Sequence, residues 1–319
     1  MAILTELKKE GFISILQQYD IGRYISHKHV PWALQNTVYF IRTTKGRFVL
    51  KIFEDSDPDF INFQIRIMKL MEREGIPVPG IIKSESGFPL LIYNKHRIMI
   101  QEHVEGKSPK RLSNPLIRDI AKNHAMMNKA LGKVRLEGKY VWRRDYQFMG
   151  PGPDVSKYKD FDMALENKKI KRDLRCVNRH NLRRSVIHGD FHGTNLLVKG
   201  DRLKAIIDWG DLNEDFIVQD VSNFIAHTFL EQRAVKSDQI RLYLRTFGKH
   251  LELNNDEKKA IYFFIKHRWI FAIVWHIKQL RIHKDHSERL EKSINESIRK
   301  YRNFSKMNVN DFLKLFQTT

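Results

Sequence analysis

Apolar, β-branched and aromatic residues concentrate in two stretches of the first third of the chain. These stretches span residues 37–42 and 47–53, and Thr44-Lys45-Gly46 between them is a tight-turn sequence. Short runs of this composition on either side of a turn are typical of paired antiparallel strands. The pattern therefore predicts a β-hairpin.

A change of spacing after the hairpin indicates a helix. Apolar positions recur at helical spacing from about residue 59 to residue 74, and Gly75 with the two following prolines ends the pattern. Two more strands are predicted, over residues 89–93 and 97–101. The first hundred residues are thus expected to be mostly strand, with one main helix.

Helical spacing dominates the rest of the chain. A helix is expected after the start signal Ser113-Asn114-Pro115, residues 133–180 look irregular and basic, and residues 185–209 look compact and strand-rich. Further helices are predicted over residues 216–232, 238–250, 256–280 and 286–304. We therefore expect an α+β protein with a small strand-rich lobe, residues 1–104, and a larger helical lobe, residues 105–319.

Composition narrows the class of protein. The chain has 319 residues, of which 42% are hydrophobic, so it can bury a core and is not a disordered polypeptide. It has no apolar run close to the roughly 20 residues of a membrane span and no signal-peptide-like start. A single cysteine, Cys176, excludes intramolecular disulfides and cysteine-based zinc sites. A cytoplasmic location is the expectation.

The net charge of +20 favours anionic ligands. Basic residues are spread along the chain, with clusters at 168–175, 179–184 and 278–284, and no zinc-finger or RNA-recognition spacing accompanies them. A solvated basic surface that favours encounter with a nucleotide is therefore preferred over nucleic-acid binding.

One segment carries a pattern of catalytic type. Asp190 and Asn195 lie in a loop that opens onto the apolar stretch 196–198, and Asp208 ends a second apolar stretch after a turn at Gly200-Asp201. A hairpin would bring Asn195 and Asp208 side by side, where an amide oxygen and a carboxylate can both bind a hard cation. Phosphoryl transfer needs such a cation and a carboxylate that orients the attacking hydroxyl.

These motifs resemble those of the aminoglycoside phosphotransferase and choline kinase superfamily, including its homoserine-kinase-like and spore-coat-kinase-like branches. Residues 188–195 look like the catalytic loop of that family, and Ile206-Ile207-Asp208-Trp209 looks like its metal-binding motif. The resemblance is sharp over residues 185–222 and faint over 133–180 and after 235. It implies a bilobal protein-kinase-like fold and the use of ATP, or GTP, with Mg²⁺.

The resemblance implies a role for each matching residue. Asp190 would be the catalytic base, and Asn195 and Asp208 would be metal ligands. His188 would support the loop through hydrogen bonds, and Asp220 would accept hydrogen bonds from the loop backbone. His192 stands where protein kinases place a cation near the transferred phosphate, although it could equally be a histidine with a purely local role.

The nucleotide-binding residues are expected in the first lobe. Lys51 shares a strand face with Val49 and Phe53, so it needs an anion such as a nucleotide phosphate unless it lies on an exposed edge. Kinases pair this lysine with a helix glutamate, and this chain has Gln64 there, which supplies a hydrogen bond but no charge.

Two other segments are expected to contact the nucleotide. Residues 34–40 occupy the position of the phosphate-covering loop, where Asn36 and Thr37 can offer donors although no Gly-x-Gly-x-x-Gly pattern is present. The stretch Gln101-Glu102-His103-Val104 matches the hinge whose backbone binds adenine. Such backbone recognition does not distinguish ATP from GTP.

The acceptor is expected to be a small molecule with a hydroxyl, such as an amino acid, an amino alcohol or a sugar. The basic composition disfavours polycationic aminoglycosides. A weakly active or inactive nucleotide-binding scaffold, such as a spore-coat assembly protein, is the alternative, and a protein kinase is disfavoured because no Ala-Pro-Glu-like segment follows Asp208. The sequence does not specify the oligomeric state. Substrate walls, which could equally be core, are expected at Trp142, Tyr146, Trp209, Asp211, Glu214 and Asp215.

Overall fold

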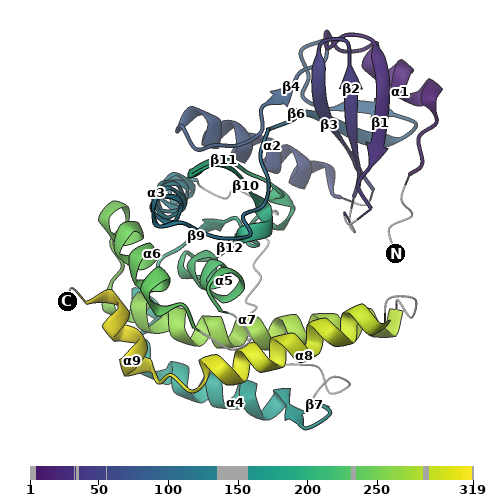
Figure 1. Ribbon diagram of the computed structural model, residues 1–319. Coiled ribbons are helices and arrows are strands. Elements are labelled where there is room, and N and C mark those ends of the chain that lie inside the picture. The colour runs from purple at the N-terminus through teal and green to yellow at the C-terminus, as the bar shows by residue number, and fades with distance from the viewer. Residues whose placement is uncertain are drawn as a thin grey trace. The chain divides into compact units, whose positions relative to one another are not determined.

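The chain is described by a computed structural model, which covers residues 5–31, 33, 36–54, 56–134, 157–230, 235–282 and 287–317. It forms two compact units. Unit 1 comprises Met1–Lys107, Leu197–Lys199 and Lys204–Ile207, and unit 2 comprises Ser108–Leu196, Gly200–Leu203 and Asp208–Thr319. Strands dominate unit 1 and helices dominate unit 2 (Figure 1), which confirms the predicted α+β class.

The described part of unit 1 contains a six-stranded antiparallel sheet in the order β1-β2-β3-β6-β4, with β5 also paired to β6. The predicted hairpin is present as β2 and β3, and the other two predicted strands are β5 and β6. The bounds are β1 Tyr24–His29, β2 Thr37–Thr43, β3 Gly46–Phe53, β4 Ile81–Ile82, β5 Leu91–Tyr93 and β6 His96–Glu102.

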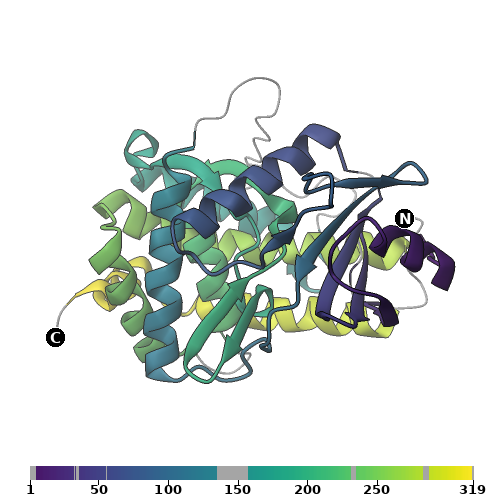
Figure 2. The same cartoon turned by 90° about the horizontal axis from the view of Figure 1, so that it is seen from above.

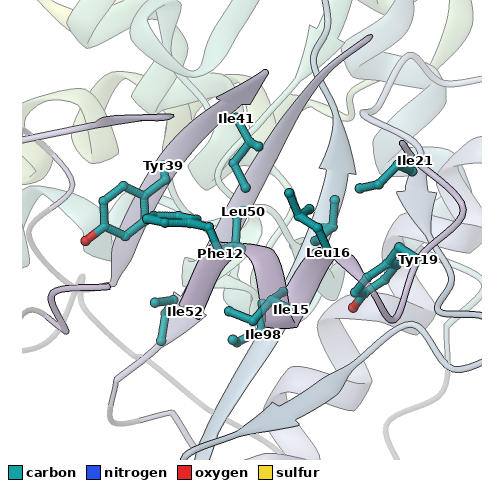
Figure 3. Packing of buried hydrophobic residues seen from close by; sticks show 11 residues of the cluster. Phe12, Ile15, Leu16, Tyr19, Ile21, Tyr39, Ile41, Leu50, Ile52 and Ile98 are labelled. Carbon is teal, nitrogen blue, oxygen red and sulfur yellow. The ribbon is translucent and has the colours of Figure 1, made fainter. Parts of the chain in front are cut away.

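One face of this sheet is covered by α1 (Lys9–Leu16), a helix that the sequence pattern did not predict. Phe12, Ile15 and Leu16 of α1 pack on the inward-facing residues of β2, β3 and β6. Figure 3 shows this cluster, and Figure 2 shows α1 beside the sheet. Each such side chain contributes roughly 1.5–3 kcal/mol on full burial. The residues in the cluster are Phe12, Ile15, Leu16, Tyr19, Ile21, Tyr39, Ile41, Leu50, Ile52, Ile98 and Ile100.

The opposite face carries α2 (Pro58–Arg73), whose Ile61 and Ile65 pack on Phe53 and Met99. The helix begins where expected because the Asp57 carboxylate accepts hydrogen bonds from the N–H groups of the first turn and Pro58 follows it. Since side chains alternate along a strand, Lys51 of β3 shares this α2-bearing face with Phe53.

Unit 2 is built around α7, which packs against α4, α5, α8 and α9. Figure 1 shows α7 and α8 running side by side with α4 next to them. The bounds are α3 Asn114–Leu131, α4 Met163–Asp173, α5 Val218–Thr228, α6 Ser237–His250, α7 Asn255–Ile282, α8 Ser287–Phe304 and α9 Val309–Leu313. No helix in the described ranges combines the length and the apolar character of a membrane span.

Most helices expected in unit 2 are present, but the irregular stretch needs correction. Residues 163–173 form α4, capped by the Asp162 carboxylate, and β7 (Lys157–Tyr158) pairs with β8 (Phe161–Asp162) before it. The expectation of irregular backbone is wrong there, and residues 135–156 lie outside the described residues.

The strand-rich stretch of the second half forms two separate antiparallel pairs. β9 (Arg184–Ile187) pairs with β12 (Asn213–Phe216), and β10 (Leu196–Lys199) pairs with β11 (Arg202–Ile206). The second pair is the predicted hairpin turned at Gly200-Asp201. The partner strand β12 was not predicted, because its sequence is largely polar.

Candidate active site

The loop that follows β9 is the centre of the candidate site. In the β9–β12 pair Ile187 lies opposite Asn213, so the loop begins beside the segment that leads into β12. Gly189 has a φ of +81°, and a Cβ atom there would lie 2.1 Å from the Asp211 carbonyl oxygen. Only glycine tolerates both the conformation and the close approach.

The carboxylate of Asp220, on α5, anchors this loop by accepting hydrogen bonds from the loop's backbone. Its Oδ2 accepts a 2.8 Å hydrogen bond from the His188 N–H, and its Oδ1 accepts a 3.0 Å bond from the Gly189 N–H. Burial raises the pKa of Asp220 to about 7, and the two backbone bonds oppose this rise. Asn223, one turn further along α5, donates to the Gly189 carbonyl at 3.1 Å. These contacts confirm the loop-anchoring role expected of Asp220.

His188 supports the loop from within the core. Its side chain is fully buried, its ring lies 4.7 Å from the Trp209 ring, and its Nδ1 accepts the Asp190 N–H at 3.3 Å. The imidazole thus holds the backbone of Asp190. A direct part in the chemistry is not needed to explain its position.

The Asp190 carboxylate lies at the end of a network of donors. Oδ2 accepts from His192 Nε2 at 3.0 Å and from Asn195 Nδ2 at 3.1 Å. Oδ1 accepts from the Arg268 guanidinium at 2.9 Å. Burial would raise the pKa of Asp190, but the hydrogen bond and charge of His192, with the charges of Arg268 and His227, hold it well below its usual range. Asp190 is therefore an ionised, firmly oriented carboxylate.

His192 is held on both sides of its ring. Besides the bond to Asp190, its Nδ1 lies 2.8 Å from the Thr194 hydroxyl. A carboxylate can only accept, so Nε2 carries the proton in this contact. The structure thus shows His192 orienting Asp190, and its predicted contact with the transferred phosphate stays a prediction.

Arg268 of α7 is a site residue that the sequence reasoning missed. Its Nε donates to His227 Nε2 at 3.0 Å, and the pKa of His227 is held well below its usual range by burial and by the Arg268 charge. One signal was available in the sequence. Ile261, Ile265 and Arg268 recur at the spacing of a buried helix face, and a charge on such a face requires an anionic partner.

Asn195 and Asp208 are the predicted metal ligands, and the hairpin topology places them at the same end of the β10–β11 pair. Asp208 adopts a left-handed conformation with φ of 62°, a strained state that is common at functional sites. No cluster of three His, Cys, Asp or Glu side chains suited to a metal occurs in the described ranges. One amide and one carboxylate fit Mg²⁺, which keeps several waters and binds substrate phosphates as further ligands.

Lys51 of unit 1 is an interior lysine. It lies on β3 between β2 and β6, is only 9% exposed, and its Nζ lies 5.0 Å from the centre of the Phe53 ring. The alternative of an exposed edge lysine is therefore wrong. Gln64 of α2 is also buried, on the face of the helix that carries Ile61 and Ile65. Their contact with nucleotide stays a prediction.

The other residues predicted to contact the nucleotide differ in whether their side chains hydrogen-bond to the described residues. Thr37 is fully buried and donates to the Glu54 carboxylate, whereas Asn36 Oδ1 is buried without a hydrogen bond to the described residues. Leu34 and Gln35 lie outside the described residues. In the predicted hinge, Gln101 contacts the Met68 sulfur, the Glu102 N–H donates to Gly80, and Val104 follows the end of β6.

A small pocket lined by both polar and apolar residues opens beside the catalytic loop within unit 2. Its enclosed space is about 20 Å³, or about 360 Å³ when the solvent at its mouth is included. Its walls come from β9, β12, α5 and α7 and are Ile187, Gly189, Asn213, Asp215, Gln219, Asn223, His267, Arg268 and Phe271.

The predicted substrate walls correspond only in part to this pocket. Asp215 lines it, whereas Trp209 is 1% exposed and belongs to the core. Glu214 faces Arg184 at 3.5 Å, and Asp211 lies next to the loop through its carbonyl group. Trp142 and Tyr146 fall outside the described residues.

Comparison with known proteins identifies the chain's relatives. A family described as "Phosphotransferase enzyme family" matches residues 28–253. A homoserine kinase of Nitrobacter hamburgensis is 26% identical over 278 residues, which is 82% of this chain and 81% of that protein. A homoserine kinase of Methylobacillus flagellatus is 26% identical over 231 residues, 70% of this chain and 69% of that protein.

Solved structures show the same fold at low identity. An amicoumacin kinase in complex with AMP-PNP, Ca²⁺ and amicoumacin has a TM-score of 0.73 at 13% identity, covering 95% of both chains. A microcompartment-associated aminopropanol kinase has a TM-score of 0.72 at 16% identity, covering 97% of this chain and 100% of that one. The family match spans more than half of the chain and includes the whole catalytic loop. The chain therefore belongs to the phosphotransferase enzyme family and is a small-molecule phosphotransferase with a kinase-like fold.

Proposed function

We propose that this phosphotransferase moves the γ-phosphoryl group of ATP to the hydroxyl of a small acceptor, with Asp190 as the base. The observation that carries the proposal is the network around Asp190. Its backbone is held by His188 and its carboxylate is fixed by His192, Asn195 and Arg268. A carboxylate oriented in this way can accept a hydrogen bond from an attacking hydroxyl and take its proton as the new P–O bond forms.

The nucleotide would be bound by residues from both parts of the sequence. Asn195 and Asp208 would hold Mg²⁺, which neutralises the charge of the triphosphate when it is bound. Lys51 would bind the α- and β-phosphates, and Asn36 offers a polar side chain for the phosphate-covering loop. The hinge segment 101–104 would bind the adenine through its backbone. The sequence does not distinguish ATP from GTP, and a cytoplasmic location stays a prediction.

The acceptor would be small, because the pocket beside Asp190 is small. The matched relatives are kinases of homoserine, and the similar structures include an aminopropanol kinase. An amino acid or amino alcohol is accordingly preferred over an aminoglycoside, and the net charge of +20 agrees with this choice.

A second function is favoured by one observation. Gln64 occupies the position of the charged helix partner of Lys51, and without that charge Lys51 is held less firmly. A weakly active nucleotide-binding scaffold is therefore the competing proposal. It predicts ATP binding with negligible transfer to any acceptor.

The test is an acceptor screen with the purified full-length chain, ATP and Mg²⁺. Homoserine, 3-amino-1-propanol, choline, hexoses and an aminoglycoside would be compared by ADP release and by mass spectrometry of the product. We expect phosphorylation of at least one small acceptor, and we expect Asp208→Asn to abolish both turnover and Mg²⁺-dependent ATP affinity. Exposed Asp238→Asn is the matched control and should retain both. ATP binding without transfer to any acceptor would establish the scaffold instead.

A further inference from the structure

Arg268 stands out because His192 and Asn195 already orient the Asp190 carboxylate without it. A base must accept a hydrogen bond from the attacking hydroxyl, yet here a guanidinium already donates to Asp190 Oδ1 at 2.9 Å. The two side chains are only 19% and 24% exposed, so water replaces this contact poorly. An arginine in that position takes one of the two acceptor sites of the oxygen that could receive the hydrogen of the attacking hydroxyl. The guanidinium therefore either only orients Asp190 or also binds a ligand.

Within the described ranges, the Arg268 guanidinium uses only some of its N–H donors, so the others can bind a ligand. It carries five N–H groups, of which one is directed at Asp190 and one at His227 Nε2. The ring of Phe271 lies 5.6 Å from the guanidinium carbon and limits its movement on one side. An arginine held by helix α7 in this way presents a planar fork that matches a carboxylate.

The same arginine forms part of the wall of the small pocket beside the loop. Asn213 belongs to the same wall, but its Oδ1 is shielded from solvent and makes no hydrogen bond within the described ranges. The group that this wall offers to a ligand is therefore the guanidinium of Arg268, which fits an acceptor molecule with a carboxylate.

We infer that Arg268 is a specificity-determining residue that binds a carboxylate of the acceptor molecule. When that carboxylate binds, the guanidinium divides its hydrogen bonds between two anions. Its bond to Asp190 Oδ1 is then weaker, so this oxygen can accept a hydrogen bond from the acceptor's hydroxyl. The positive charge of Arg268 also offsets part of the repulsion between the acceptor's carboxylate and Asp190. An amino alcohol without a carboxylate offers no such exchange. This inference rests on the proposed function and names its substrate class.

The test compares two probes that differ only in the carboxylate, L-homoserine and 3-amino-1-propanol. Both carry the same primary hydroxyl and amine. We expect the wild-type chain to prefer homoserine by about 10- to 150-fold in kcat/KM, the range of a charge-assisted hydrogen bond. Arg268→Gln should abolish that preference, mainly through a higher KM for homoserine. Because Arg268 also orients Asp190, kcat is expected to fall for both probes.

Two further variants control the comparison. Arg281→Gln lies on the same helix at an exposed position and should keep the full preference. Arg268→Lys keeps the charge without the planar fork and should retain a smaller preference. ATP affinity and thermal unfolding of each variant show whether the variant is folded. The comparison of the two probes with the wild-type chain does not depend on any variant.

The outcomes separate the inference from the proposed function. If wild type uses the two probes equally well, or if Arg268→Gln lowers kcat/KM for both probes by the same factor, Arg268 only positions Asp190 and the inference is wrong, although the kinase function stands. If wild type phosphorylates no acceptor of either kind, the proposed function itself is wrong. A preference for 3-amino-1-propanol would also overturn the inference.

Discussion

Three glycines, two in the catalytic loop and one in the β10–β11 turn after it, allow the cost of backbone strain to be predicted. Gly189 combines a positive φ of +81° with a Cβ position 2.1 Å from the Asp211 carbonyl oxygen. Gly200 in the β10–β11 turn has a φ of +57° and no atom within 4 Å of a Cβ. Gly193 has ordinary φ and only a 3.6 Å contact with the Thr228 hydroxyl. Alanine therefore meets both backbone strain and steric overlap at residue 189, strain alone at residue 200, and neither at residue 193.

The expected magnitudes differ accordingly. The left-handed conformation costs about 1–2 kcal/mol for alanine, and the lower entropy of the unfolded chain returns about 0.4–1 kcal/mol. Overlap with a backbone oxygen cannot be relieved by rotating a side chain, and overpacking adds roughly 1–3 kcal/mol. We expect losses of unfolding free energy of about 3 kcal/mol for Gly189→Ala and about 1 kcal/mol for Gly200→Ala, with no loss for Gly193→Ala.

Urea denaturation followed by circular dichroism measures these differences, with equal m-values as the check that each variant unfolds in the same way. Gly189→Ala should also weaken phosphoryl transfer, because the loop must shift to accommodate the methyl group. The reasoning is refuted if Gly189→Ala costs no more than Gly200→Ala. A large loss for Gly193→Ala would refute it as well.

Three other variants test separate contacts. Glu257 is fully buried and accepts two hydrogen bonds from the half-exposed guanidinium of Arg183. Glu257→Gln should therefore cost about 2 kcal/mol of unfolding free energy in urea, and no change would contradict the role of the pair. Because the folded-state pKa of Asp220 is raised to about 7, its stabilising contribution is complete below its unfolded pKa near 4 and is lost as pH rises through 7. The loss of stability in Asp220→Asn should therefore be larger at pH 5 than at pH 8, and the opposite trend in unfolding free energy would contradict the assignment. Lys51→Met should lower ATP affinity about 10- to 100-fold by calorimetry, while the exposed turn variant Lys45→Met should not, and equal affinities would remove Lys51 from the nucleotide site.

Local sequence patterns were sufficient to predict much of the fold. The β2–β3 hairpin was predicted because strand-forming residues flank a turn sequence, and α2 because Gly75 and the prolines end it clearly. The catalytic loop and the hairpin after it were predicted because Asp190, Asn195 and Asp208 lie close together in the sequence. Their spacing along one short segment is sufficient to define the motif.

The missed features depend on longer-range contacts or on weaker local signals. α1 is short, and the residue before it makes no capping hydrogen bond from its side chain. α4 has its apolar positions Met163 and Ile170 among many lysines, which obscured the helical spacing. Arg268 meets Asp190 across a separation of 78 residues, and only the packing of α7 against the segments around the loop brings them together. No spacing rule in the sequence gives that contact.

Single-turnover phosphoryl transfer from labelled ATP, in wild type and in Asp190→Asn, tests the central claim most directly. With the acceptor identified and both substrates saturating, we expect the variant to transfer at least about 100-fold more slowly, the typical contribution of a general base, while its ATP affinity stays within about 3-fold. A variant that transfers at the wild-type rate would contradict the assignment of Asp190 as the base.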